Sequence, residues 1–379
     1  MKKGLRTAGV ILAVSLFAGC GTNAMADMKT AKYLGVVNYG APETNRDNKD
    51  NFRYRFLADG AEEVFAIDNG QADSEGKYEY PVQNRLKEGY LYTIITDGST
   101  VKKAVEFWHI DKAYEPPVKG TPGVRTLKNF LKTAVEPVGT TLYIFGGGWD
   151  WQDEGSSVQA RTLGVAPEWV KFFNDHDANF SYRTDDAKTT YYPYGEYNEY
   201  YYAGLDCSGY AGWAVYNTFE KENGRPGYVA ASTKFAQSLA DKGWGVRTQN
   251  RENVKPGDIV SIKGHVWISL GTCDDGSVVI LHSTPSASRT GQPGGGVQIG
   301  AVGRDSSCEA VELAEKYMSQ YYPKWYERYG VPLNSPDVYF SFGADTAGVF
   351  SWDTAAGGLS DPEGIQGMKP AEVLREIFG

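Results

Sequence analysis

The chain has 379 residues and a formal net charge of −9 at pH 7, and its 26 tyrosines and 9 tryptophans make it rich in aromatic side chains. This length is sufficient for two or three domains with a substantial core. The acidic balance argues against wholesale binding of nucleic acid, because a polyanion is repelled over most of such a surface.

Residues 1–20 have the pattern of an export signal. A positive start precedes an apolar run at 10–18, which is too short to remain as a membrane-spanning helix. Segment 16–20 resembles a lipoprotein-processing box, in which Cys20 becomes the lipidated first residue of the mature protein. Cleavage after Ala26, behind a small-x-small triplet, is the alternative. Either route predicts a protein outside the cytoplasm, attached to a membrane by lipid only or secreted.

A predicted tether at 21–31 leads into a region at 32–112 that has the pattern of a small all-β domain. Five short runs of β-branched and aromatic residues are bounded there by Gly, Asp or Asn. Asp97-Gly98 lies between the last two runs and is a strong hairpin signal. This pattern predicts a small barrel of SH3-like or OB-like type. The barrel is expected either to bind a ligand or to be an appendage without one.

A proline-rich linker at 113–123 separates this region from the second domain at 124–379. The second domain is predicted to be α+β, with a tyrosine-rich insertion at 149–205 and a helical C-terminal extension at 307–379. Its predicted helices are at 124–135, 210–222, 231–242, 307–328 and 370–378, and its predicted strands around the Asp-Gly turn are at 265–270 and 277–281.

Cys207 is the candidate nucleophile of the second domain. It follows Asp206 and precedes a predicted helix, and the positive end of a helix dipole favours the thiolate and so lowers the pKa of a thiol. Once Cys20 is lipidated, three cysteines remain, and an odd number in an exported protein leaves at least one thiol free. Cys273 and Cys308 are the other two, and they are able to pair with each other.

Two histidines follow on one predicted hairpin. His265 is expected to form a thiolate–imidazolium pair with Cys207 and to protonate the leaving amine later. His282, on the partner strand, would hold the His265 ring in position, and the Cys207 amide would contact the oxyanion. A buried structural cysteine and a Cys/His/His zinc site are the alternatives. No paired cysteine or carboxylate motif supports zinc, so no metal and no other cofactor is expected.

Together these residues resemble the NlpC family of papain-like endopeptidases, which act on the bacterial cell wall. The resemblance extends over about residues 125–300 and implies a papain-like fold. It also implies Cys207, His265 and His282 as nucleophile, base and orienting residue. The matching pieces are Tyr143 with Gly146-Gly147, Asp206–Tyr210, Pro256–Asp258 with Gly264–Val266, and His282.

The same resemblance implies a substrate. Tyr143, Asp206 and Ser208 would line a pocket for the free amino end of a peptidoglycan stem peptide, and the D-glutamyl–diamino acid bond would be hydrolysed. The insertion and the C-terminal extension depart from compact members of the family. A non-catalytic peptidoglycan-binding lipoprotein is one alternative function, and a related amidase or acyltransferase acting on other amide bonds is another.

Overall fold

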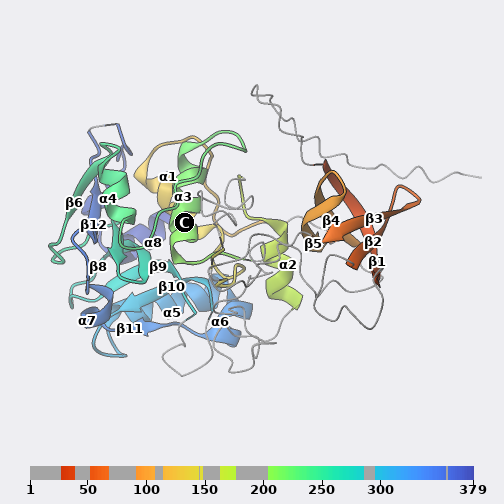
Figure 1. Cartoon of the computed structure of the whole chain (residues 1–379). Coiled ribbons are helices and arrows are strands. Elements are labelled where there is room, and N and C mark those ends of the chain that lie inside the picture. Colours follow the sequence, from red (N-terminus) through yellow and green to blue (C-terminus); the bar gives the residue numbers. More distant parts are fainter. Residues whose placement is uncertain are drawn as a thin grey trace, which may run out of the picture.

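A computed structural model describes residues 27–38, 52–67, 91–106, 114–144, 146–147, 163–175, 204–285, 295–355 and 357–379. The described chain comprises a small all-β region and a larger region of mixed helices and sheet, an α+β architecture (Figure 1). The predicted export signal, the lipidation residue Cys20 and most of the tyrosine-rich insertion lie outside these residues.

The all-β region is a ring of five strands. β1 pairs with both β2 and β4, and β3 lies parallel to β5, so that the order β1-β2-β3-β5-β4 closes on itself. Such closure leaves no unpaired strand edge. The strands are β1 (Asp27–Asn38), β2 (Phe52–Ala58), β3 (Ala61–Ile67), β4 (Leu91–Asp97) and β5 (Thr100–Glu106).

Aromatic side chains fill the interior of this ring. Tyr33, Tyr54 and Phe56 are buried together, and the Tyr33 and Phe56 ring centroids are 5.3 Å apart. Gly98, with a φ of 56°, forms the turn between β4 and β5 at the predicted Asp-Gly hairpin. β1 begins at Asp27, inside the predicted tether. Strand pairing uses the backbone, so the polar composition of this segment does not prevent it.

The larger region is built on a seven-stranded sheet in the order β11-β10-β9-β8-β7-β12-β6. Its neighbouring strands are antiparallel except for β10 and β11. The extension predicted to be helical therefore contributes two strands, and β12 lies between β6 and β7. The strands are β6 (Gly245–Thr248), β7 (Ile259–Ile262), β8 (His265–Thr272), β9 (Val278–Ser283), β10 (Val297–Val302), β11 (Leu333–Asn334) and β12 (Gly348–Trp352).

Helices pack around this sheet (Figure 1). The long helix predicted at 307–328 is divided in two, because Pro323 has no amide hydrogen to continue the hydrogen-bond ladder. The helices are α1 (Leu127–Val135), α2 (Pro167–Asp175), α3 (Cys207–Phe219), α4 (Phe235–Ala240), α5 (Glu309–Tyr321), α6 (Pro323–Tyr329), α7 (Pro336–Tyr339) and α8 (Pro370–Phe378), with a 3₁₀ turn at Ile365–Gly367.

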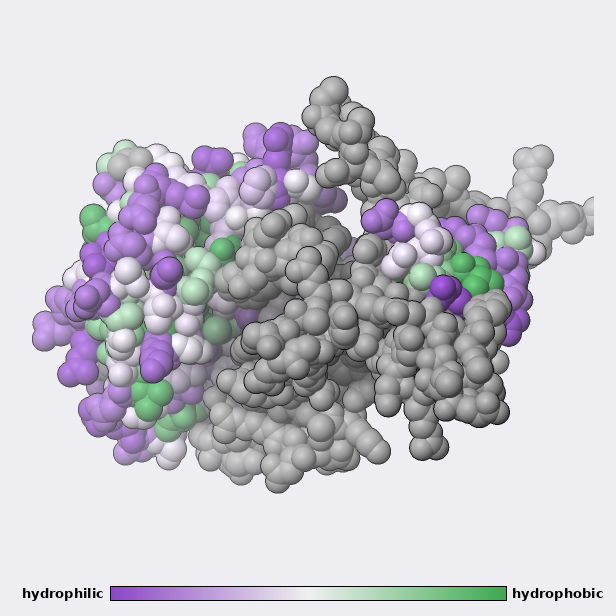
Figure 2. All heavy atoms as spheres, viewed as in Figure 1, coloured by the Kyte–Doolittle hydropathy of each residue, from purple (hydrophilic) through white to green (hydrophobic). Residues whose placement is uncertain are grey.

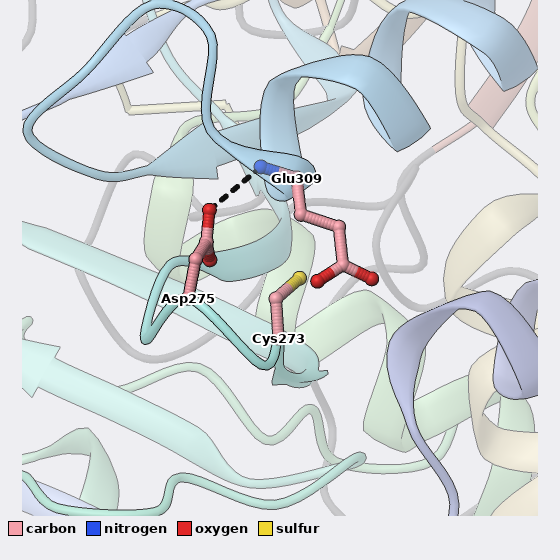
Figure 3. Close-up of side chains that lie close together, drawn as sticks. All are labelled: Cys273, Asp275 and Glu309. Atoms are coloured by element: carbon pink, nitrogen blue, oxygen red, sulfur yellow. Dashed lines mark hydrogen bonds between the residues drawn. The ribbon is translucent and has the colours of Figure 1, made fainter.

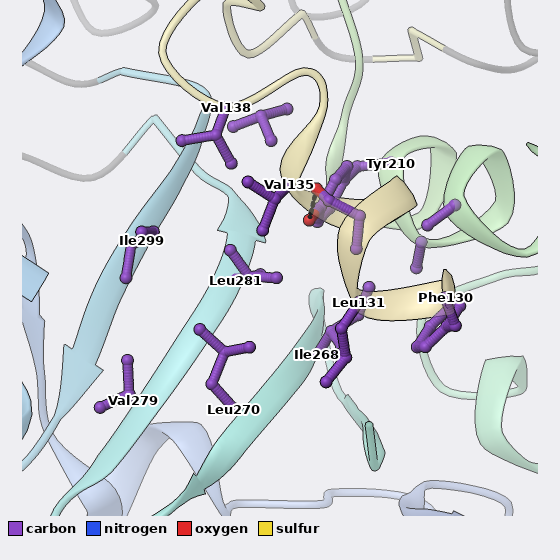
Figure 4. Close-up of a cluster of buried hydrophobic side chains, with 14 of the residues drawn as sticks. Phe130, Leu131, Val135, Val138, Tyr210, Ile268, Leu270, Val279, Leu281 and Ile299 are labelled. Atoms are coloured by element: carbon purple, nitrogen blue, oxygen red, sulfur yellow. Dashed lines mark hydrogen bonds between the residues drawn. The ribbon is translucent and has the colours of Figure 1, made fainter. Parts of the chain in front are cut away.

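α3 is the central helix, and all thirteen of its residues are buried. Its sequence contains no charged side chain, and a helix without a polar face is stable only when it is enclosed on all sides. Tyr210 donates a hydrogen bond of 2.7 Å to the carbonyl oxygen of Ala134 and so joins α3 to α1. Figure 4 shows aliphatic side chains of α1 facing those of β8, β9 and β10, including Leu131, Ile268 and Leu281.

The visible surface of the α+β region is mostly hydrophilic (Figure 2). Among the described residues, the exposed large hydrophobic side chains are Leu57, Val64, Val124, Val246 and Val338. None of the described helices combines the length and the hydropathy that crossing a bilayer requires.

Candidate active site

Asp206 places Cys207 at the first position of α3. The Asp206 carboxylate oxygen Oδ1 accepts hydrogen bonds from the Gly209 amide at 2.6 Å and from the Ser208 hydroxyl at 3.0 Å. A side-chain acceptor at this position satisfies an amide that the helix leaves without a partner. The helix therefore begins three residues earlier than its apolar pattern predicts, and Cys207 lies at its N-terminus.

The same aspartate connects the helix start to the predicted Gly146-Gly147 turn. Its second oxygen accepts from the Gly146 amide at 3.2 Å, and its own amide donates to the Gly147 carbonyl at 3.0 Å. A Cβ atom on Gly147 would lie 2.4 Å from the carbonyl oxygen of Gly204, so this close approach requires glycine. Tyr143, 8% exposed, lies on the strand-like segment that leads into the turn.

Asp206 and Ser208 therefore stabilise the start of α3, a structural function in addition to the substrate binding predicted for them. Both are buried, and Ser208 donates to the aspartate that caps its own helix. The substrate-binding roles that the family resemblance implies for Tyr143, Asp206 and Ser208 stay predictions.

The Cys207 thiol lies beside the start of β8. Its sulfur is 3.9 Å from the carbonyl oxygen of Gly264, and the backbone N–H of Val266 acts to lower the pKa of the thiol. Gly264 and Val266 are the two chain neighbours of His265. The fold thus places the candidate nucleophile beside the backbone on either side of His265, the residue predicted to be its base.

The protonation of the two groups differs from the expected thiolate–imidazolium pair. Burial, and secondly the Asp206 carboxylate, raise the pKa of Cys207 to about 12, although the helix N-terminus was expected to lower it. Burial also lowers the pKa of His265 to about 4. Desolvation of the charged forms outweighs the helix dipole here. The resting pair at neutral pH is therefore a thiol and a neutral imidazole.

A raised thiol pKa has a measurable consequence. We expect iodoacetamide to modify Cys207 slowly at pH 7 in the substrate-free protein, and about tenfold faster with each added pH unit, because the reactive thiolate increases in that proportion. Mass spectrometry of the modified peptide measures the rate. Cys273, whose pKa burial also raises to about 12, is the internal reference. A rate that reaches a plateau below pH 7 would instead indicate a thiolate at rest.

His265 and His282 meet across two strands of the sheet. His265 Nε2, at the start of β8, is 3.3 Å from His282 Nδ1 near the end of β9. The side chain of His282 is fully buried, and burial followed by the proximity of His265 holds its pKa well below the usual range. His282 is therefore neutral, and its tautomer decides whether Nδ1 accepts from His265 Nε2 or donates to it.

A tyrosine that sequence reasoning missed completes this cluster. The Tyr339 hydroxyl, on α7, is 3.3 Å from His282 Nδ1, and its ring centroid is 5.2 Å from that of His265. Ser335 before Pro336 is a recognisable helix start, but this local signal does not reveal where the helix packs. Only the folding of the C-terminal extension onto the sheet brings Tyr339 to the histidines.

The described residues do not support a zinc site at Cys207. Among them, one set of three metal-ligating side chains has its ligand atoms within 4.8 Å of one another, and it consists of Cys273, Asp275 and Glu309 (Figure 3). Backbone amides hydrogen-bond to the two carboxylates of this cluster and hold them in place. Asp275 accepts from the Glu309 amide at 2.8 Å at the start of α5, and Glu309 accepts from the Asp274 amide at 3.1 Å.

Cys273 and Cys308, which the sequence left able to pair, are both buried free thiols, as is Cys207.

Comparison with protein-family models, with curated proteins and with solved structures finds no match to this chain. Function is therefore inferred from the geometry of the cluster formed by Cys207, His265, His282 and Tyr339.

Proposed function

We propose that this protein is an exported, papain-like cysteine endopeptidase that hydrolyses peptidoglycan stem peptides. Cys207 is the nucleophile, His265 the base and His282 the orienting residue, and lipidation at Cys20 anchors the chain. One observation carries the proposal. A thiol at the N-terminus of a buried helix lies beside the strand whose histidine is 3.3 Å from a second, fully buried histidine.

The protonation states fit a mechanism in which the substrate triggers the proton transfer. As Sγ of Cys207 attacks the scissile carbonyl carbon, its proton moves to neutral His265, and the Cys207 amide contacts the developing oxyanion. His265 Nε2 faces His282, so its Nδ1 is the nitrogen that takes this proton. His265 then protonates the leaving amine, and water hydrolyses the remaining thioester to release the acid and restore the thiol.

The raised pKa of Cys207 also favours a second candidate, a lipoprotein that binds peptidoglycan without cleaving it. In that protein the buried thiol would be a packing group, and the two histidines would be polar residues that satisfy each other. An amidase or an acyltransferase would use the same three residues on a different amide bond.

Digestion of purified cell wall distinguishes these functions. We expect incubation of diaminopimelate- and lysine-type walls with the full chain to release fragments with new D-glutamate carboxyl ends and new diamino acid amino ends. Mass spectrometry of the soluble muropeptides identifies both ends. Bound protein with intact walls would favour the binding function. New ends at another amide bond would favour an amidase, and fragments joined to an added amine would favour an acyltransferase.

A further inference from the structure

The hydroxyl of Tyr339 is 3.3 Å from His282 Nδ1, the nitrogen that also faces His265. Whether this nitrogen carries a proton decides which ring nitrogens of the two histidines are protonated. We propose that Tyr339 is a positioning residue that fixes the tautomer of His282 and thereby keeps the reacting nitrogen of His265 free of a proton. The inference rests on the proposed function, since it assumes that His265 is the base.

The direction of the hydrogen bonds follows from the neighbours of Tyr339. The Thr284 side chain hydrogen-bonds to the Tyr339 hydroxyl and acts to lower the pKa of Tyr339. Burial nevertheless raises the pKa of Tyr339 overall, so the phenol keeps its proton. A protonated phenol can donate, and we take Thr284 as the donor to its oxygen, so that the Tyr339 proton is directed to His282 Nδ1, 3.3 Å away.

When His282 Nδ1 is an acceptor, the positions of the protons on both histidine rings follow. Neutral His282 must then carry its proton on Nε2, and the single lone pair of Nδ1 is shared between the Tyr339 hydroxyl and a proton on His265 Nε2, each 3.3 Å away. The neutral His265 ring therefore has its proton on Nε2 and none on Nδ1. That is the tautomer able to take a proton from Cys207.

The other tautomer would be favoured without Tyr339. His282 Nε2 is buried and has no hydrogen-bond partner among the described residues, and a Cβ atom on Gly300 would lie 3.0 Å from it. A proton on this nitrogen loses its hydrogen bond to water without replacement. Moving it to Nδ1 would let His282 donate to His265 Nε2. The His265 proton would then be on Nδ1, which would block transfer from Cys207.

The C-terminal extension holds the tyrosine ring independently of its hydroxyl. Trp267 of β8 donates a hydrogen bond of 3.3 Å to the Tyr339 carbonyl oxygen, and their rings are in contact. Ser335 caps α7, and Arg304 forms a two-bonded ion pair with Asp337 on the same helix. A phenylalanine at position 339 would therefore keep the packing and lose only the hydrogen bonds.

Tyr339→Phe in the full chain tests the proposal, with Tyr322→Phe as the matched control. Tyr322 is also buried, and its hydroxyl has no partner among the residues that the structure describes. Nitrogen-15 NMR of the imidazoles without substrate reports the tautomers directly. We expect protonated Nε2 in His282 of the wild type and of the control, and protonated Nδ1 in Tyr339→Phe. On a soluble muropeptide, kcat of Tyr339→Phe should fall about 10²-fold with little change in KM.

Thr284→Val is a second variant, for the case that Tyr339→Phe fails to fold. It frees the Tyr339 oxygen to accept from His282 and is expected to shift the tautomer in the same direction. The same His282 tautomer in the wild type and in every folded variant would overturn the proposal, whatever happens to the rate. A tautomer shift in a protein that hydrolyses no wall would support the positioning role of Tyr339 and would count against the proposed function alone.

Discussion

We expect Cys207→Ala to abolish the proposed wall hydrolysis, with a loss on the order of 10⁶-fold, as for removal of one member of a catalytic triad. Alanine keeps the small apolar volume of the buried site and removes only the sulfur that forms the bond. Release of soluble muropeptides from purified wall, followed over time, measures the rate. The helix should remain intact, because Asp206 rather than Cys207 supplies its capping hydrogen bond.

Cys308→Ala is the matched control for this variant. Cys308 is also buried and free, and it precedes α5, away from the two histidines. The control should digest wall at the wild-type rate, and thermal unfolding of both variants checks their folding. Undiminished digestion by folded Cys207→Ala would contradict the enzyme hypothesis and leave the binding function.

His265→Ala is expected to lower kcat by at least about 10³-fold, because a positioned general base contributes on this scale. Burial sets the pKa of His265 to about 4, so the wild type should keep an unprotonated base, and its activity, down to about pH 5. The initial rate on a soluble muropeptide between pH 4 and pH 8 measures both effects.

Added imidazole provides a specific control for His265→Ala. It enters the space that the truncated side chain leaves and should restore part of the rate, whereas it should not activate Cys207→Ala, which retains its base. A variant with near wild-type kcat, or one that imidazole does not rescue although substrate binding is intact, would show that His265 is not the base.

Local signals in the sequence indicated much of the fold. The Asp-Gly turn at position 97, the apolar spacing of α1 and the start of α8 at Pro370 depend on residues close together in the chain, and the structure has an element at each. Errors in the boundaries have local causes. Asp206 accepts a hydrogen bond from the Gly209 amide, so that α3 begins at Cys207, and Pro323 separates α5 from α6.

The strand order of the five-stranded barrel could not be predicted from local sequence signals. Short runs of β-branched and aromatic residues indicated five strands but left SH3-like and OB-like types open, because strand order depends on contacts between distant segments. The order β1-β2-β3-β5-β4, with β3 parallel to β5, is set by these distant contacts.

The sequence by itself determined the candidate reacting groups of this protein, namely a cysteine at a helix start and two histidines on one hairpin. Their chemical states were decided only by the tertiary structure. Enclosure of α3 raises the pKa of Cys207 against the helix dipole, and folding of the C-terminal extension brings Tyr339 to His282 across 57 positions of the chain. Helix caps and hairpins depend on near neighbours, whereas burial and long-range hydrogen bonds depend on the whole packed domain.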